Sequence, residues 1–381
     1  MFLMATSAIG PGFITQTTTF TARLGAAFAF AILISILVDI AVQLNVWRVI
    51  GVSRLRAHEL GNKVAPGVGW VLTVLVVAGG LVFNIANVGG SGLGLNAMLG
   101  LNAKIGGAIS ALIAIGVFSI RKAGVALDRI VVVLGAVMIA LTAYVAVVSD
   151  PPVGAALRNA VLPDQIDFLV ITTLIGGTVG GYITYAGAHR MLDSGMTGPE
   201  NVGVVSRSSI QGILVTAVMR VLLFLAVLGV VGGGVTLAEE HPTASAFEAA
   251  AGQVGLRMFG VILWAAAITS VIGAAYTSVS FLTSDATSPR RRSLLTIGFI
   301  VISAVVYLLI GTTPVTLLVF AGAFNGLILP IGFTLVLWVA WRRRDLLGGY
   351  RYPVWLLAIG VLAWVLSLYL GWESLAGLGK L

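Results

Sequence analysis

Two glycine-rich stretches place hydroxyl and amide groups inside otherwise apolar segments. The first opens with Gly10-Pro11-Gly12 and continues with four polar residues, Thr15, Gln16, Thr17 and Thr18. The second runs from Gly176 to Tyr185 and includes Gly177, Thr178, Gly180, Gly181, Tyr182 and Thr184. Such groups can hydrogen-bond a neutral or zwitterionic solute, whereas transition metals need anionic, imidazole or sulfur ligands. We therefore expect these residues to bind a small substrate, with neither a metal site nor a cofactor.

Other roles for the same residues stay open. Threonine hydroxyls can hydrogen-bond carbonyl groups one turn earlier in their own helix. Glycines can allow two membrane helices to pack closely. A hydrated cation could be held by hydroxyl and carbonyl oxygens, although magnesium usually keeps at least one carboxylate ligand. An enzyme is not expected, because acids, histidines and cysteines do not cluster in the apolar segments.

The composition defines the class of protein. Of 381 residues, 59% are hydrophobic and 9% are charged, and the mean hydropathy is +1.07. No soluble fold of this length has so few charges, so we predict a polytopic helical membrane protein surrounded by lipid. The net charge of +8 would favour a nucleic-acid partner in a soluble domain. Here the basic residues lie in loops, where they set membrane topology, and no nucleic-acid partner is expected.

Eleven apolar runs have the length of a membrane-spanning helix. They cover residues 5–24, 26–47, 68–99, 106–120, 128–149, 166–188, 209–233, 258–283, 293–311, 314–341 and 353–371. No long polar segment separates them, so we predict one all-α transmembrane domain over residues 1–381. We expect it to be a monomer.

Two of these helices should be interrupted, and we expect the backbone N–H and C=O groups freed in the sixth to face a substrate. Four glycines between Gly176 and Gly181 weaken the sixth, by about 1 kcal/mol each relative to alanine. The Gly-Pro-Gly opening and the polar residues after it weaken the first. Interrupted helices five positions apart are typical of an inverted five-plus-five repeat that binds substrate near the bilayer midplane. We predict repeats over residues 1–149 and 166–341, followed by an eleventh helix over 353–371.

The loop charges predict the orientation. Most of the 22 basic residues lie in alternate loops, around residues 48–63, 121–129, 190–207, 290–292 and 342–351. The acidic residues Asp150, Asp164, Asp167, Glu239 and Glu240 lie in the opposite loops. Since basic loops stay in the cytoplasm, we predict a cytoplasmic N-terminus, an external C-terminus and a bacterial inner-membrane location.

Two charges inside apolar segments are candidates for gating or coupling. Asp39 lies in the second predicted helix and Arg220 near the middle of the seventh. Charges at this depth are costly unless they are paired or solvated. Because these helices are counterparts in the predicted repeat, we expect an Asp39–Arg220 pair, either a gate or a fixed structural ion pair, with Arg23 as the rival partner. Further gating candidates are Asn84, Asn87 and Asn325.

Four motifs resemble one known family. Gly10-Pro11-Gly12-Phe13 is similar to an opening GPG motif, Gly90–Asn96 to GSAIALN, Ile175–Val179 to LGATV, and Asn325–Pro330 to NAVLLP. Together they resemble the Nramp family of divalent-metal transporters, a branch of the LeuT-like transporters. The resemblance covers nearly all of the sequence and implies a LeuT-like fold and metal-cation transport.

The sequence departs from that family where the family binds metal and protons. The family uses the Asp and Asn of a DPGN motif in helix one, but residues 1–38 contain no Asp, Glu or Asn. The family's helix-six methionine falls on Gly180, and its helix-three acids fall on Asn84 and Asn87. Its helix-ten glutamine falls on Ile328. The resemblance therefore implies an Nramp-related transporter with an altered substrate and no proton coupling. The alternative is a secondary transporter of a small neutral or zwitterionic organic solute, such as an amino acid.

Overall fold

The computed structural model describes residues 9–119, 121–283 and 287–378, and for residues 121–132 and 376–378 it describes only the backbone. The described residues form α-helices and two short 3₁₀ helices. In chain order these are α2 (Pro11–Leu24), η1 (Gly25–Ala27), α3 (Phe28–Ser53), α4 (Ala57–Val64), α5 (Val68–Leu99), α6 (Ala103–Ser119), α7 (Arg121–Val148), α8 (Val153–Val161), α9 (Phe168–Thr178), α10 (Ile183–Asp193), η2 (Pro199–Asn201), α11 (Val202–Gly232), α12 (Pro242–Leu282), α13 (Pro289–Leu309), α14 (Pro314–Arg342) and α15 (Val354–Leu378).

The predicted all-α membrane architecture is confirmed. Within the described residues, eight helices are long and apolar enough to cross a membrane, or nine if the bent pair Val133–Val148 and Val153–Val161 is one span. Eleven spans were predicted because α2 and α3 were counted separately, although η1 joins them into one apolar stretch. The 17-residue α6 was also counted, and its length is at the lower end of the range for a membrane-spanning helix. The beginning of the first predicted run, residues 5–8, lies outside the described residues.

Proline and glycine set several helix boundaries. Pro11, Pro242, Pro289 and Pro314 stand in the first turn of their helices, where the missing N–H costs nothing. Gly252 bends α12 with a φ of 61°, a conformation that favours glycine. The residues before this bend form the predicted external segment, and those after it form the predicted eighth helix.

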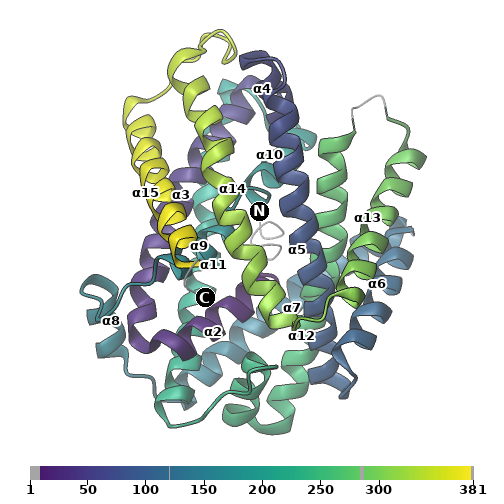
Figure 1. Ribbon diagram of the computed structural model, residues 1–381, viewed down its shortest axis with the longest axis vertical. Helices are drawn as coiled ribbons and strands as arrows, with labels where there is room; N and C mark the ends of the chain where they lie inside the picture. The colour runs from purple at the N-terminus through teal and green to yellow at the C-terminus, as the bar shows by residue number, and fades with distance from the viewer. Residues whose placement is uncertain (1–8, 120, 284–286, 379–381) are drawn as a thin grey trace.

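The centre of the bundle is formed by long helices that pack closely. In Figure 1, α14 lies between α15 and α5 and crosses in front of α9, and it packs against all three. Helix α5 packs most extensively against α12. Gly94 allows this approach, because a Cβ atom there would lie 2.5 Å from the backbone nitrogen of Trp264. Small residues at such contacts are what membrane helices use to approach one another.

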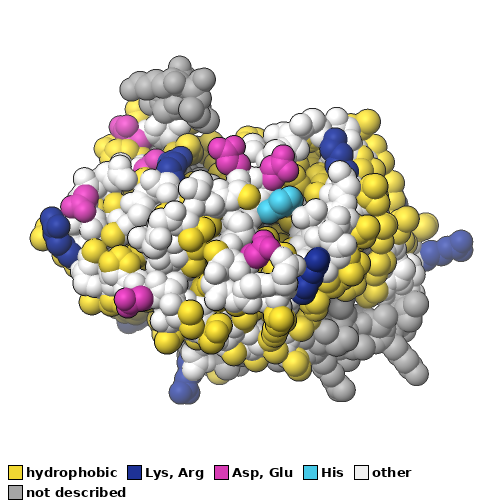
Figure 2. All heavy atoms as spheres, turned by 90° about the horizontal axis from the view of Figure 1, so that it is seen from below, with side chains coloured by type: hydrophobic (Ala, Val, Ile, Leu, Met, Phe, Trp, Pro, Cys, Tyr) yellow, Lys and Arg dark blue, Asp and Glu magenta, His cyan; other side chains and the backbone are white. Residues whose placement is uncertain are grey.

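The end of the bundle that contains α8 is rich in acidic side chains. Figure 2 shows Asp and Glu side chains distributed over this face. Arg23 forms a salt bridge with Asp167 there, and Arg158 forms one with Asp164 at 3.4 Å. This distribution agrees with the predicted external side, and the orientation itself stays a prediction. The Arg23–Asp167 pair also shows that Arg23 is not the partner of Asp39.

Candidate functional site

The sixth predicted helix is broken, as expected, but over a shorter stretch than predicted. Helix α9 ends at Thr178 and α10 begins at Ile183, so the non-helical residues are 179–182. A Cβ atom on Gly181 would lie 2.4 Å from Cγ2 of Ile328, and one on Gly180 would lie 2.2 Å from the carbonyl oxygen of Gly176. Glycine is therefore required inside the break for steric reasons.

The backbone N–H groups released by the break are bound by α14. The N–H of Gly181 donates to the carbonyl oxygen of Asn325 at 2.9 Å, and the N–H of Tyr182 donates to Asn325 Oδ1 at 3.1 Å. Asn325 Nδ2 in turn donates to the carbonyl oxygen of Gly79 on α5, at 3.2 Å. The expectation that the released N–H groups face a substrate is thus wrong for Gly181 and Tyr182. Asn325 links α5, the break and α14.

Gly176 and Gly177 have a different role from Gly180 and Gly181. Both lie within α9 and allow close packing, the alternative considered from the sequence. A Cβ atom on Gly176 would lie 1.8 Å from the carbonyl oxygen of Gly322, and one on Gly177 would lie 2.4 Å from Oε1 of Gln16. Helix α9 therefore contacts α14 almost backbone to backbone, and the Gln16 side chain of α2 packs against Gly177 of α9.

The threonine hydroxyls mostly hydrogen-bond within their own helices. Thr17 donates to the Phe13 carbonyl at 2.7 Å, and Thr178 donates to the Leu174 carbonyl at 2.6 Å. Thr18 donates to the carbonyl of Ile14, at 3.1 Å. These hydroxyls can still accept hydrogen bonds, as Thr18 does from Thr243 at 2.9 Å. They therefore offer a substrate acceptors rather than donors.

Other polar atoms at the broken helices have unused hydrogen-bonding capacity. Gln16 Nε2 donates to the Leu318 carbonyl at 2.9 Å, while its Oε1 is buried and has no partner among the described residues. The Thr184 hydroxyl is likewise buried and unpartnered in the described part of the chain. Thr15 is buried on α2. Buried polar atoms without partners are rare in folded proteins, so these are candidate contacts for a substrate or water.

Tyr182 directs an aromatic ring away from the break toward α5 and α12. Its hydroxyl is hydrogen-bonded to that of Thr277 on α12. Its ring lies 6.3 Å from the ring of Phe83, measured between centroids. Phe83 also faces α2, because a Cβ atom on Gly12 would lie 3.7 Å from its Cζ. The sequence analysis did not identify Phe83, since nothing distinguishes it from other apolar residues of α5.

Asp39 and Arg220 are both buried and attract each other through space, but they do not form a salt bridge. Their exposed fractions are 2% and 1%. Asp39 lies near both the Thr178 hydroxyl and Arg220, and it attracts Arg220 electrostatically. No nitrogen–oxygen distance between the two side chains is within 4.0 Å, and neither takes part in any other ion pair among the described residues. Asp39 thus brings a carboxylate to the break, which corrects the expectation of an uncharged pocket.

The two predicted polar residues of α5 lie in a separate helix interface. Asn84 Nδ2 donates to the Ser303 hydroxyl on α13 at 3.1 Å. Asn87 is fully buried, and neither polar atom of its amide has a partner within the described residues. The structure therefore brings Asn84 together with α13 rather than with the broken helices. Their role as gating candidates stays a prediction.

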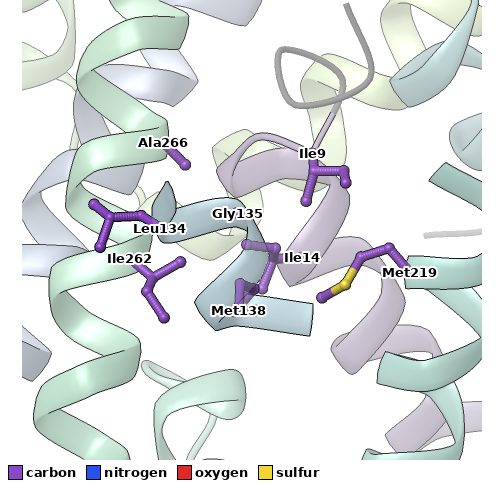
Figure 3. A pocket seen from close by; sticks show the side chains of 8 residues that line it. All are labelled: Ile9, Ile14, Leu134, Gly135, Met138, Met219, Ile262 and Ala266. Atoms are coloured by element: carbon purple, nitrogen blue, oxygen red, sulfur yellow. The ribbon is translucent and has the colours of Figure 1, made fainter. Parts of the chain in front are cut away.

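An apolar cavity lies beside the beginning of α2. Figure 3 shows its lining, which comes from α7, α11, α12 and the start of α2: Ile9, Ile14, Leu134, Gly135, Met138, Met219, Ile262 and Ala266. It offers no hydrogen-bonding side chain. The sequence could not reveal it, because apolar residues line cavities and pack against lipid alike.

Acidic and imidazole side chains are not gathered into a metal site within the part of the chain that the structure describes. Among the residues that the structure describes, no group of three or more His, Cys, Asp and Glu side chains could hold a metal ion. At the break, Asp39 is accompanied by hydroxyl, amide and aromatic groups. Such a set can hydrogen-bond an organic solute and neutralise one positive charge on it.

The chain is similar to known proteins over nearly its whole length. Residues 1–376 match the family described as "Natural resistance-associated macrophage protein-like", or Nramp. The uncharacterized membrane protein YcsG of Bacillus subtilis (strain 168) is 52% identical over 371 residues, which cover 97% of this chain and 91% of that protein.

Two solved structures share the fold. The crystal structure of the Eremococcus coleocola manganese transporter in complex with an aromatic bis-isothiourea substituted compound gives a TM-score of 0.75 at 18% identity, covering 99% of this chain and 85% of that one. The crystal structure of MhsT in complex with L-phenylalanine gives a TM-score of 0.70 at 17% identity, covering 98% of this chain and 97% of that one. These likenesses confirm the predicted LeuT-like fold. With the family match over residues 1–376, they show that this chain is a membrane transporter of the Nramp family.

Proposed function

We propose that this chain transports a small neutral or zwitterionic organic solute rather than a transition metal. The observation that supports this is the set of groups at the break between α9 and α10. It comprises the Gln16 amide, threonine hydroxyls and the Asp39 carboxyl group, without sulfur or imidazole. One carboxylate and several hydroxyls are a poor site for manganese, which binds best where several anionic or nitrogen ligands meet.

Transport of a divalent metal is the second candidate. It is favoured by the family and by the fold shared with a manganese transporter. The fold shared with MhsT, whose structure contains L-phenylalanine, shows that this architecture also accommodates amino acids. Because one fold can host different substrates, the groups at the site weigh more than the fold.

The two candidates are separated by binding and uptake measurements on the purified full chain in proteoliposomes. We expect saturable uptake of at least one organic solute from a panel of amino acids and other small neutral or zwitterionic molecules. We expect no calorimetric signal for manganese or magnesium at micromolar concentration. Micromolar manganese binding together with manganese uptake would instead establish the metal carrier.

We further propose that transport is not coupled to protons through α5. Asn84 and Asn87 cannot exchange protons near neutral pH, and a proton relay inside a membrane needs titratable side chains at depth. Uptake into proteoliposomes should therefore be the same with and without an imposed pH gradient when the membrane potential is held at zero. A several-fold stimulation by an inward proton gradient would contradict this proposal.

A further inference from the structure

Arg220 on α11 is a buried cation whose hydrogen-bonding capacity is unused. The residue is 1% exposed, and its Nε and Nη2 atoms have no hydrogen-bond partner within the described residues. Removing a guanidinium from water without replacing its hydrogen bonds costs several kcal/mol. A transporter that keeps such a group in its interior needs an anionic partner for it during at least part of its cycle.

The surroundings of Arg220 place it beside α2, the helix that begins at Pro11. Its guanidinium carbon lies 4.3 Å from the centroid of the Phe13 ring, one residue beyond Gly12 on α2. The contact with the ring leaves the Nε and Nη2 atoms without a hydrogen-bond acceptor among the described residues. A cation over an aromatic ring is weakly stabilised by the contact, but the ring supplies no hydrogen-bond acceptor for the N–H groups.

Asp39 is the acidic side chain that attracts Arg220, although the two are not in contact. It lies near Thr178 at the end of α9, but the Thr178 hydroxyl donates its proton to the Leu174 carbonyl. Its Oδ1 atom is buried and also lacks a partner among the described residues. Arg220 and Asp39 are buried and carry opposite charges, but they do not touch. A ligand could bind between them if it had an acceptor for the Arg220 N–H groups and a donor for the Asp39 oxygens.

We propose that Arg220 binds the carboxylate of the transported solute, while Asp39 accepts a hydrogen bond from an N–H group of the same molecule. The inference rests on the proposed function and specifies its substrate class: a small zwitterion with an ammonium group beside its carboxylate. A guanidinium binds a carboxylate through two parallel N–H···O hydrogen bonds. A dianion such as a phosphate is a poorer match, because Asp39 repels its second charge.

The rival explanation is that Arg220 and Asp39 form a direct ion pair in another conformation and serve only as a gate. The two explanations differ in what a neutral double variant does. If the residues only pair with each other, the D39N/R220Q variant keeps its substrate affinity. If Arg220 binds the carboxylate, the same variant loses affinity for carboxylates even when it folds well.

The test is thermal stabilisation of the purified full chain by a panel of amino acids, N-acetyl amino acids and monocarboxylates, each compared with its carboxamide. We expect an acid of the panel to raise the unfolding temperature, and its carboxamide to have no effect at the same concentration. For that acid, R220Q should weaken binding about 100-fold, because it removes the charged hydrogen bonds to the carboxylate. R220K should weaken binding about 10-fold, because lysine keeps the charge but cannot form two parallel hydrogen bonds. The control is R207Q, an exposed arginine on the same helix, which should bind normally.

Three results would overturn the inference: stabilisation by carboxamides as strong as by the acids, R220Q affinity within about threefold of the parent, or no acid in the panel binding at all. Transport of a solute without a carboxylate would reject the inference and leave the proposed function standing. Manganese binding and uptake without any organic substrate would reject the proposed function itself. Size-exclusion profiles of R220Q and D39N/R220Q show whether each variant is folded before its affinity is interpreted.

Discussion

Asn325 should hold the break of the sixth helix in place, and replacing it with leucine tests this directly. Leucine has nearly the same size but removes the acceptor for the Tyr182 N–H and the donor to the Gly79 carbonyl. A buried N–H left without an acceptor costs about 1–3 kcal/mol, and a lost interhelical hydrogen bond adds about 0.5–1.5 kcal/mol. The backbone bond from Gly181 to Asn325 remains. We therefore expect Asn325→Leu to lower the free energy of unfolding by about 2–4 kcal/mol.

This loss should appear as a modest fall in unfolding temperature. Taking about 2.1 cal/mol/K of unfolding entropy per residue over the 381 residues, each kcal/mol shifts the midpoint by about 1.3 °C. The expected fall is therefore roughly 3–5 °C, measured by differential scanning fluorimetry in detergent, and it should be accompanied by loss of uptake in proteoliposomes. A fall below 1 °C with unchanged uptake would refute the claim that Asn325 organises the break.

Gly79→Ala perturbs the same contact from the other side. A Cβ atom on Gly79 would lie 2.5 Å from Asn325 Oδ1, so the asparagine must move and the Tyr182 N–H loses its acceptor. Gly298→Ala on α13 is the matched control, because a Cβ atom there meets nothing within 4 Å. We expect Gly79→Ala to behave like Asn325→Leu and Gly298→Ala to leave stability and uptake unchanged. Equal effects of the two alanine variants would point to a general sensitivity to helix substitution instead.

Two further predictions concern pH and topology. Burial lowers the pKa of His58 on α4 below its ordinary value of 6.5, with Glu59 favouring and Arg56 opposing the charged ring. Because the unfolded state then binds a proton more readily, stability should fall as the pH drops below about 6.5, and His58→Gln should make this fall smaller in melts at pH 7 and pH 5. The chain contains no cysteine, so single-cysteine variants report topology cleanly. In intact cells, a membrane-impermeant maleimide should label Glu239→Cys, whereas Arg291→Cys should react only after lysis.

Much of the fold could be predicted from the sequence because its signals are local. Each of the eleven predicted apolar runs contains a helix, and the α-helices α2, α12, α13 and α14 each begin at a proline. The break of the sixth helix was predicted because Gly180 and Gly181 lie within an apolar run. Its true extent, residues 179–182, depends on contacts with α14 that a single stretch of sequence does not contain.

The site was predicted less well than the fold because its properties depend on which groups meet. Thr17 and Thr178 are polar residues that could line a binding site. Their hydroxyl groups instead donate hydrogen bonds to carbonyl groups one turn earlier in their own helices. The released N–H groups were expected to be available, but Asn325, more than 140 residues away, binds them. The carboxylate of Asp39 reaches the break from α3, and no spacing rule connects it to Thr178. Tertiary contacts decided each of these cases.

The arrangement of the two buried charges follows the predicted repeat in a crossed manner. Asp39 belongs to the first predicted repeat and lies at the break between α9 and α10, in the second. Arg220 belongs to the second repeat and lies against Phe13 on α2, in the first. Each half thus contributes one charged side chain that lies beside a helix of the other half: Asp39 beside α9 and Arg220 beside α2. A ligand that contacts both charges bridges the two halves, so its binding energy can act on their relative position, which is where alternating access takes place in inverted-repeat transporters. A solute bound by only one of the two charged side chains would contact one half only, and its binding energy would not act on the relative position of the halves. On this reasoning D39N should reduce uptake more than binding, while R220Q should reduce both.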